Sequence, residues 1–152
     1  MKVTNFLTTT LFTISLSPLG HAFQDLAFPK VPEPTITPGS LCEDPDQHRY
    51  PERIPYCNRD VSSNQKWAII DQYDEDFGYQ IRRTGRDNFK IDHFIPLCMG
   101  GSNENENLWP QHRSVYEQTD PWEQSLCVDL SNGDITQQQA IDTIYRIKLG
   151  VQ

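Results

Sequence analysis

Four cysteines constrain the fold of this 152-residue chain more than any other feature of its sequence. They are Cys42, Cys57, Cys98 and Cys127, and an even number in a small exported chain indicates two disulfides. Of the three pairings, we favour Cys42 with Cys57 and Cys98 with Cys127, because each closes a short loop. A loop of about 15 residues contributes on the order of 3 kcal/mol. The alternative is a zinc site of Cys98, Cys127 and His112, which the lack of any Cys-x-x-Cys pair disfavours.

The first residues have the composition of an export signal. Lys2 is followed by a mostly apolar stretch at 6–19, and Gly20-His21-Ala22 ends in a small residue of the kind that signal peptidase accepts. We predict cleavage after Ala22. A membrane anchor is the alternative, but the stretch is shorter than the roughly 20 residues of a spanning helix. The expected product is secreted or periplasmic and has no membrane anchor.

The remaining length suits one domain with a single core. Prolines recur at 29, 32, 34 and 38 and are followed by Gly39 and Ser40, which predicts an extended tether. We therefore expect a signal peptide at 1–22, a tether at 23–40 and one domain at 41–152.

Apolar periodicity and capping signals predict a mixed α+β domain. Ser62 with Gln65 and Thr136 with Gln139 have capping-box spacing, and Asp120 before a proline is typical of a helix start. The apolar stripe after Thr136 is assigned to the core. The expected elements are a helix at 63–73, strands at 78–83 and from Phe89, and helices from Asp120 and Thr136.

The segment from Lys90 to His112 carries the chemistry. Asp92 offers a hard oxygen ligand for a divalent cation, and the imidazole of His93 is neutral and basic near pH 7. The glycines of the 100–103 turn can take positive φ, and Asn107 can hydrogen-bond the loop and hold His93 in one orientation. Strand alternation places Asp92 and His93 on opposite faces, so both serve one site only if the strand ends or twists there.

This segment contains, in order, Asp92-His93, Pro96-Leu97, Gly100-Gly101 and 107–111. That ordered combination resembles the HNH superfamily of His-Me finger endonucleases. It is particularly similar to small secreted bacterial HNH nucleases with the pattern DHxxPLxxGGSN…NLWPQ. The resemblance implies a ββα-metal finger, here with flanking helices and stapled by disulfides. It further implies that His93 removes a proton from water while one cation sits against the scissile phosphate. Asn107 is then a residue of the catalytic loop. The hypothesis also requires that the His93 ring be accessible to water and not packed in the interior.

One position departs from the superfamily pattern. The ligand often found nine residues after the middle Asn is here Tyr116, a poor ligand for Mg²⁺. As a metal ligand in addition to Asp92, we rank Glu117 first and His112 second, with Asp120 as a further alternative. A carboxylate ligand favours Mg²⁺, the cofactor we expect, whereas His112 would favour Mn²⁺ or Zn²⁺.

Net charge argues against a nucleic-acid partner. The mature chain would have 12 basic residues (13 less Lys2) and 21 acidic ones, a net charge of −9, which repels phosphates. Just before the motif, however, four cations gather with Asp87 as the only acid until Asp92. We predict that they bind substrate; the alternative is scattered solvated charge. They are Arg82, Arg83, Arg86 and Lys90.

These expectations define an exported endonuclease that hydrolyses DNA, and RNA as a second substrate, with little sequence preference. No protein partner is evident in the sequence. One alternative is a secreted binding or inhibitory module that keeps the same scaffold without catalysis. Another is a phosphodiesterase that acts on a small nucleotide.

Overall fold

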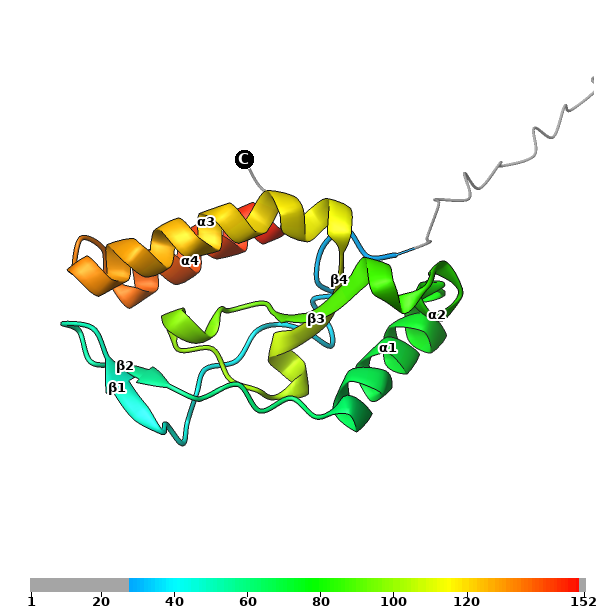
Figure 1. Ribbon diagram of the computed structural model, residues 1–152, viewed down its shortest axis with the longest axis horizontal. Helices are drawn as coiled ribbons and strands as arrows, with labels where there is room; N and C mark the ends of the chain where they lie inside the picture. Colours follow the sequence, from blue (N-terminus) through cyan, green and yellow to red (C-terminus); the bar gives the residue numbers. More distant parts are fainter. Residues whose placement is uncertain (1–27, 151–152) are drawn as a thin grey trace, which may run out of the picture.

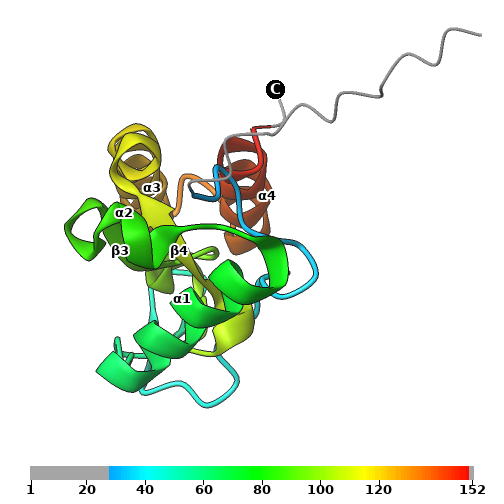
Figure 2. The same ribbon diagram turned by 90° about the vertical axis from the view of Figure 1, so that its right-hand side faces the viewer.

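The computed structural model describes residues 28–150, so the predicted signal peptide lies outside the described residues. It is a mixed α+β structure, as predicted, with two antiparallel two-stranded sheets and four helices in the described range. A hairpin of β3 (Phe89–His93) and β4 (Leu108–His112) lies between α1 (Ser63–Phe77) and the helix pair α3 (Arg113–Asn132) and α4 (Gln137–Lys148) (Figures 1 and 2). His93 is the last residue of β3, and it is followed along the chain by a loop, β4 and α3.

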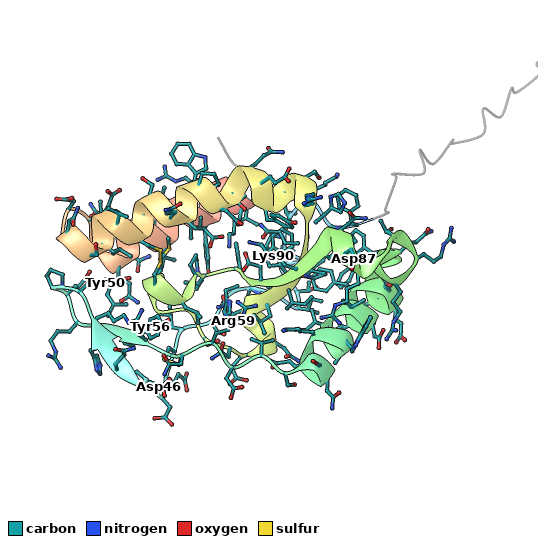
Figure 3. The ribbon with its side chains drawn as sticks, viewed as in Figure 1. Asp46, Tyr50, Tyr56, Arg59, Asp87 and Lys90 are labelled. Atoms are coloured by element: carbon teal, nitrogen blue, oxygen red, sulfur yellow. A yellow bond between two sulfur atoms is a disulfide. The ribbon has the colours of Figure 1, made fainter. Side chains whose placement is uncertain are left out.

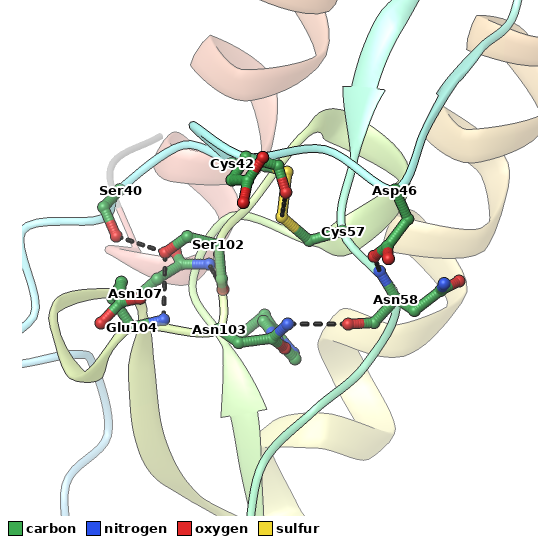
Figure 4. Close-up of a disulfide and its surroundings, with 11 residues drawn as sticks. Ser40, Cys42, Asp46, Cys57, Asn58, Ser102, Asn103, Glu104 and Asn107 are labelled. Carbon is green, nitrogen blue, oxygen red and sulfur yellow. Dashed lines mark hydrogen bonds between the residues drawn. A yellow bond between two sulfur atoms is a disulfide. The ribbon is translucent and has the colours of Figure 1, made fainter.

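A second, smaller hairpin packs against the loop between β3 and β4. It consists of β1 (Gln47–Arg49) and β2 (Ile54–Tyr56), and the Cys42–Cys57 disulfide joins the segments that flank it (Figure 4). The second disulfide, Cys98–Cys127, ties the loop between β3 and β4 to α3. Both predicted pairings are confirmed.

Local capping explains where the predicted helices begin and end. The Ser62 side chain accepts from the Gln65 amide at the start of α1, and Gly78 ends this helix in the left-handed region. Thr136 and Gln139 form the predicted capping box of α4. The helix expected at 63–73 is confirmed and continues to Phe77, because no residue before Gly78 stops it.

The strand predicted at 78–83 is wrong. The chain forms a short helix there, α2 (Ile81–Thr84), because the Asp74 carboxylate accepts from the Ile81 amide at 2.8 Å and from the Arg82 amide at 3.1 Å. A carboxylate that satisfies the free amides of a first turn stabilises helix over strand. Ile81 is buried in the core, so its apolar spacing reflects one helical turn.

The helix start predicted at Asp120 is also wrong. Helix α3 begins at Arg113, where the His112 ring acts as the N-cap and its Nδ1 accepts from the Ser114 amide at 3.1 Å. Pro121 lies inside this helix on an exposed face. Proline keeps a helical φ and removes one backbone hydrogen bond, which a 20-residue helix with buried contacts tolerates.

Two apolar clusters flank the central hairpin. One packs α1 against β3 and β4 around Ile70, Tyr73 and Trp109. The other packs α3 against α4 around Leu130 and Ile144. Ala140, Ile141 and Ile144 of the predicted stripe lie in this second cluster, which confirms their assignment to the core, whereas Ile147 is half-buried and lies outside the cluster. The two helical layers are therefore held to opposite sides of the strand that carries His93.

The described part of the predicted tether, residues 28–40, packs onto the domain, whereas 23–27 lie outside the described residues. Thr37 is 1% exposed, its hydroxyl lies 2.8 Å from the Tyr73 hydroxyl, and the Gly39 amide donates to the Glu106 carbonyl at 2.8 Å. The folded part of the chain therefore begins before Leu41, because these prolines direct the chain along the core instead of away from it. No helix in 28–150 is long and apolar enough to cross a membrane.

Candidate functional site

The loop after His93 is braced from within by Asn107. Its Oδ1 accepts from the Ile95 amide at 2.8 Å, and its Nδ2 donates to the carbonyls of Ile95 and Ser102 at 2.9 Å each. Gly101 lies so close that a Cβ there would come within 1.8 Å of the Ile95 carbonyl oxygen. Asn107 therefore makes the loop hydrogen bonds expected of it, and it fixes the backbone directly after His93.

The hydrogen bonds of His93 define its tautomer. Asn103 donates through Nδ2 to the Asn58 carbonyl at 2.7 Å (Figure 4), which turns its acceptor oxygen toward His93 Nε2 at 3.1 Å. Arg59 can only donate, and its Nη1 lies 3.1 Å from His93 Nδ1. The proton of the neutral ring is therefore on Nε2, and the lone pair of Nδ1 faces Arg59.

Burial keeps this imidazole neutral. Desolvation is the largest of the effects that lower the pKa of His93 to about 4, and the Arg59 charge acts in the same direction. The hydrogen bond to Asn103 opposes them. A ring with that pKa is an unprotonated base at neutral pH.

The sequence hypothesis required an accessible ring, and in this respect it is wrong. His93 is 3% exposed, because Arg59 and Asn103 cover its two ring nitrogens from the solvent side. Arg59 itself is exposed and donates its other nitrogen, Nη2, to the Ile91 carbonyl at 2.7 Å. The exposed Arg59, which is labelled in Figure 3, thus covers Nδ1 with its guanidinium.

Arg59 also lines a small basic cavity of about 230 Å³, which His93 itself does not line. Its charged lining residues are Arg59, Lys66, Arg86 and Lys90, and no acidic residue lines it. Among the described residues, Arg59 and Lys66 have no carboxylate within ion-pair distance. We call this space the basic cavity. In a chain with a net charge of −8, it concentrates positive charge beside His93.

The four predicted substrate-binding cations divide into two groups. Arg86 and Lys90 line the basic cavity, although the Lys90 ammonium turns to Asp120 at 2.7 Å. Arg82 and Arg83 do not line it. Arg82 pairs with Asp71 and, like Arg86, stacks over the Trp67 ring, while Arg83 is exposed.

Asp92 points to the opposite face of β3 and joins a group of three carboxylates. One oxygen each from Asp92, Asp120 and Glu123 lies within 4.8 Å of the others. Asp92 Oδ2 is buried and accepts no hydrogen bond from the described residues, with the ammonium groups of Lys90 and Lys148 at 3.4 and 3.8 Å. Hard oxygen donors at this spacing fit a divalent cation in type, provided that the half-exposed Lys90 gives way.

Lys148, from the last turn of α4, closes this group. Its side chain has no exposed area, and its ammonium donates to the His93 carbonyl at 2.5 Å and lies 2.6 Å from Glu123. Burial is the main cause that raises the pKa of Glu123 above its ordinary value, and Lys148 opposes the rise. Asp92 and Glu123 thus share a buried cation that also contacts the backbone of the candidate base.

The two ligands ranked beside Asp92 lie elsewhere. Glu117 is exposed and pairs with Arg113 at 3.2 Å. His112 pairs with Phe89 in the β3–β4 register, at the opposite end of the hairpin from His93. The structure brings Asp92 together with Asp120 and Glu123, and with neither Glu117 nor His112. Strand alternation persists to the last residue of β3, so Asp92 and His93 do not face one site.

Comparison of the chain with models of known protein families, with curated protein sequences and with solved structures found no match. The functional argument therefore stands on the geometry of His93, the basic cavity and the carboxylate group.

Proposed function

We propose that this protein is a divalent-metal-dependent phosphodiester hydrolase of the HNH type, with DNA as its main substrate and His93 as general base. The observation that carries the proposal is the Nδ1 lone pair of a neutral His93, which faces Arg59 in the basic cavity. A phosphate that enters this cavity offers Arg59 an anionic partner, and charge-assisted hydrogen bonds to phosphate are stronger than the one to a neutral imidazole. Substrate binding would then uncover the base.

The residues of the chain have defined roles in this reaction. Once Arg59 turns to the phosphate, a water molecule takes its place at His93 Nδ1. The water gives a proton to Nδ1 as its oxygen bonds to phosphorus and the bond to the 3′-oxygen breaks. The 3′-oxygen leaves with the bonding electron pair and takes up a proton from solvent, and the proton on Nδ1 later returns to solvent. Asn103 accepts from Nε2 throughout, so it stabilises the imidazolium that forms. Asn107 holds the loop that positions both groups.

The cation is proposed to bind Asp92 with Asp120 and Glu123. Asp92 and His93 face opposite sides of β3, but Lys90 both lines the basic cavity and contacts Asp92 and Asp120, so a cation that replaced its ammonium would adjoin that cavity. When bound there, it would supply charge neutralisation at a phosphate oxygen, with Mg²⁺ favoured by an all-oxygen ligand set. Lys90 is the side chain that must leave, since it is partly exposed whereas Lys148 is buried.

Metal dependence tests the proposal directly. We expect purified mature protein to nick supercoiled DNA in Mg²⁺, to lose that activity in EDTA and to regain it when Mg²⁺ is restored. Parallel reactions in Mn²⁺ and Zn²⁺ identify the preferred ion. Inactivity with all three ions would reject the enzyme, and nicking that survives EDTA would reject the cation.

A prediction on affinity isolates the basic cavity. Arg59→Ala combined with Lys66→Ala should weaken binding of a short labelled duplex and reduce the slope of log K against log salt by about 2, because each phosphate contact contributes about 0.9. Fluorescence anisotropy in EDTA measures binding without cleavage. Arg49→Ala combined with Arg113→Ala removes the same charge outside the cavity and serves as the control. Equal slopes in both variants would show that the basic cavity does not bind the substrate.

A binding module without catalysis is the second candidate, and a specific observation favours it. His93 is almost fully buried and the three carboxylates already have two ammonium partners, as in a structural ion cluster. This candidate predicts tight, metal-independent binding to a partner and no turnover of DNA, RNA or a small phosphodiester. The metal series separates the two functions.

A further inference from the structure

A second cavity, of about 880 Å³, opens between the first half of α3 and the C-terminal end of α4. It shares no lining residue with the basic cavity. Its volume is in the range of sites that hold small organic ligands, roughly 300 to 1,000 Å³. We call it the α3–α4 cavity.

The charged lining of the α3–α4 cavity is entirely positive. It contains Lys30, Arg146 and Lys148 and no acidic residue. Lys148 turns its ammonium to Glu123, which leaves Lys30 and Arg146 for a ligand. The Lys30 ammonium lies over the Phe28 ring, and Arg146 donates to the Asp142 carbonyl and the Thr143 hydroxyl within α4. Both are exposed, and in the described part of the chain neither has a carboxylate within ion-pair distance. In so acidic a chain, this pair favours an anionic ligand.

The wall of the cavity combines the Trp122 ring with the aliphatic side chains of Val31, Val115 and Ile147, so its polar groups decide between a planar ring and an alkyl chain. Trp122 lines it and is 57% exposed, an unusual position for a large aromatic side chain. An exposed indole is a stacking surface for a flat ring, and nucleobases stack on such rings. Ser114 and Gln118 add hydroxyl and amide groups that can hydrogen-bond the edges of a base or a sugar. An acyl chain would bury those groups without partners.

We propose that the α3–α4 cavity binds a mononucleotide, with its base against Trp122 and its phosphate between Lys30 and Arg146. The proposal does not rest on the hydrolytic function, since neither His93 nor any residue of the basic cavity contributes to the binding site. It assigns the cavity a ligand that combines one planar ring with one anionic group.

Calorimetry with four probes tests this assignment in EDTA: AMP, adenosine, inorganic phosphate and octanoate. We expect saturable binding of AMP, weaker binding of adenosine and of phosphate because each satisfies half of the site, and weaker binding of octanoate. Trp122→Ala and Arg146→Gln should each lower AMP affinity roughly ten-fold, as expected for loss of a stacking or charge-assisted contact. Arg113→Gln, which removes an exposed guanidinium from the same helix α3 outside the cavity, should leave AMP affinity unchanged.

Three results would overturn the proposal: no heat of binding at millimolar AMP, octanoate binding as tight as AMP binding, or equal effects of Arg146→Gln and Arg113→Gln. A His93→Ala protein should bind AMP like the wild type. The mononucleotide site and the hydrolase can therefore fail separately, because one is read from calorimetry in EDTA and the other from nicking in Mg²⁺.

Discussion

His93→Ala should lower the rate of nicking of supercoiled DNA by roughly 10² to 10⁴, the usual contribution of a general base. The variant lacks Nδ1, which alone is placed to accept a proton beside Arg59. Because the ring is buried, its loss also leaves a cavity, so circular dichroism and thermal melting must show that the variant is folded at the assay temperature. His48→Ala, which removes an exposed histidine from β1, is the matched control and should keep full activity. A folded His93→Ala protein that nicks at the wild-type rate would end the assignment.

The pH profile of the wild type gives an independent reading of the same ring. The folded-state pKa of His93 is lowered to about 4 from 6.5, so the free enzyme holds a neutral base at all pH values above about 4. We expect kcat/KM, which reports on the free enzyme, to stay level as the pH falls from 7 to about 5 and then to decline. A decline of kcat/KM with a midpoint near pH 6.5 would mean that the ring titrates as it does in water, which contradicts a buried neutral base.

The parts of the fold that the sequence predicted depend on short-range signals. Ser62 and Thr136 cap their helices through a residue three positions along, and Cys42 with Cys57 closes a loop within one segment. The two errors in secondary structure arose where a side chain outside the predicted element decided the outcome. Asp74 caps α2 from the preceding helix, and His112 caps α3 from the end of β4.

The candidate site was only partly predictable for the same reason. His93, Asp92 and Asn107 lie in one motif and could be identified from their order. Arg59 is 34 residues away from His93 in sequence and follows β2 in an irregular stretch, so only the tertiary fold brings it to the ring. Lys148 did leave a signal. It continues the spacing of Ala140 and Ile144 on the apolar stripe of α4, and a cation at a core position indicates a buried acidic partner.

Lys148→Met should destabilise the protein by about 3 to 5 kcal/mol at pH 7, because removal of one partner leaves buried carboxylates without compensation. The ammonium has no exposed area, lies 2.6 Å from Glu123 and donates to the His93 carbonyl, so solvent cannot replace it. Urea unfolding of wild type and variant measures the difference. Methionine fills a similar volume, which keeps the loss electrostatic. A loss below about 1 kcal/mol would show that the cluster does not depend on this charge.

Two further measurements separate charge from packing. Adding Glu123→Gln to Lys148→Met should recover part of the loss, since the double variant has one fewer unpaired charge.

Burial raises the folded-state pKa of Glu123, and loss of Lys148 raises it further. An acid with a raised folded-state pKa costs stability once the pH exceeds its unfolded-state pKa, and the cost grows until the pH passes the folded-state pKa. The gap between wild type and Lys148→Met should therefore narrow as the pH falls toward 4.5, the ordinary value for glutamate. A gap that stays constant with pH would assign the loss to packing and reject the buried charge of Glu123 as its cause.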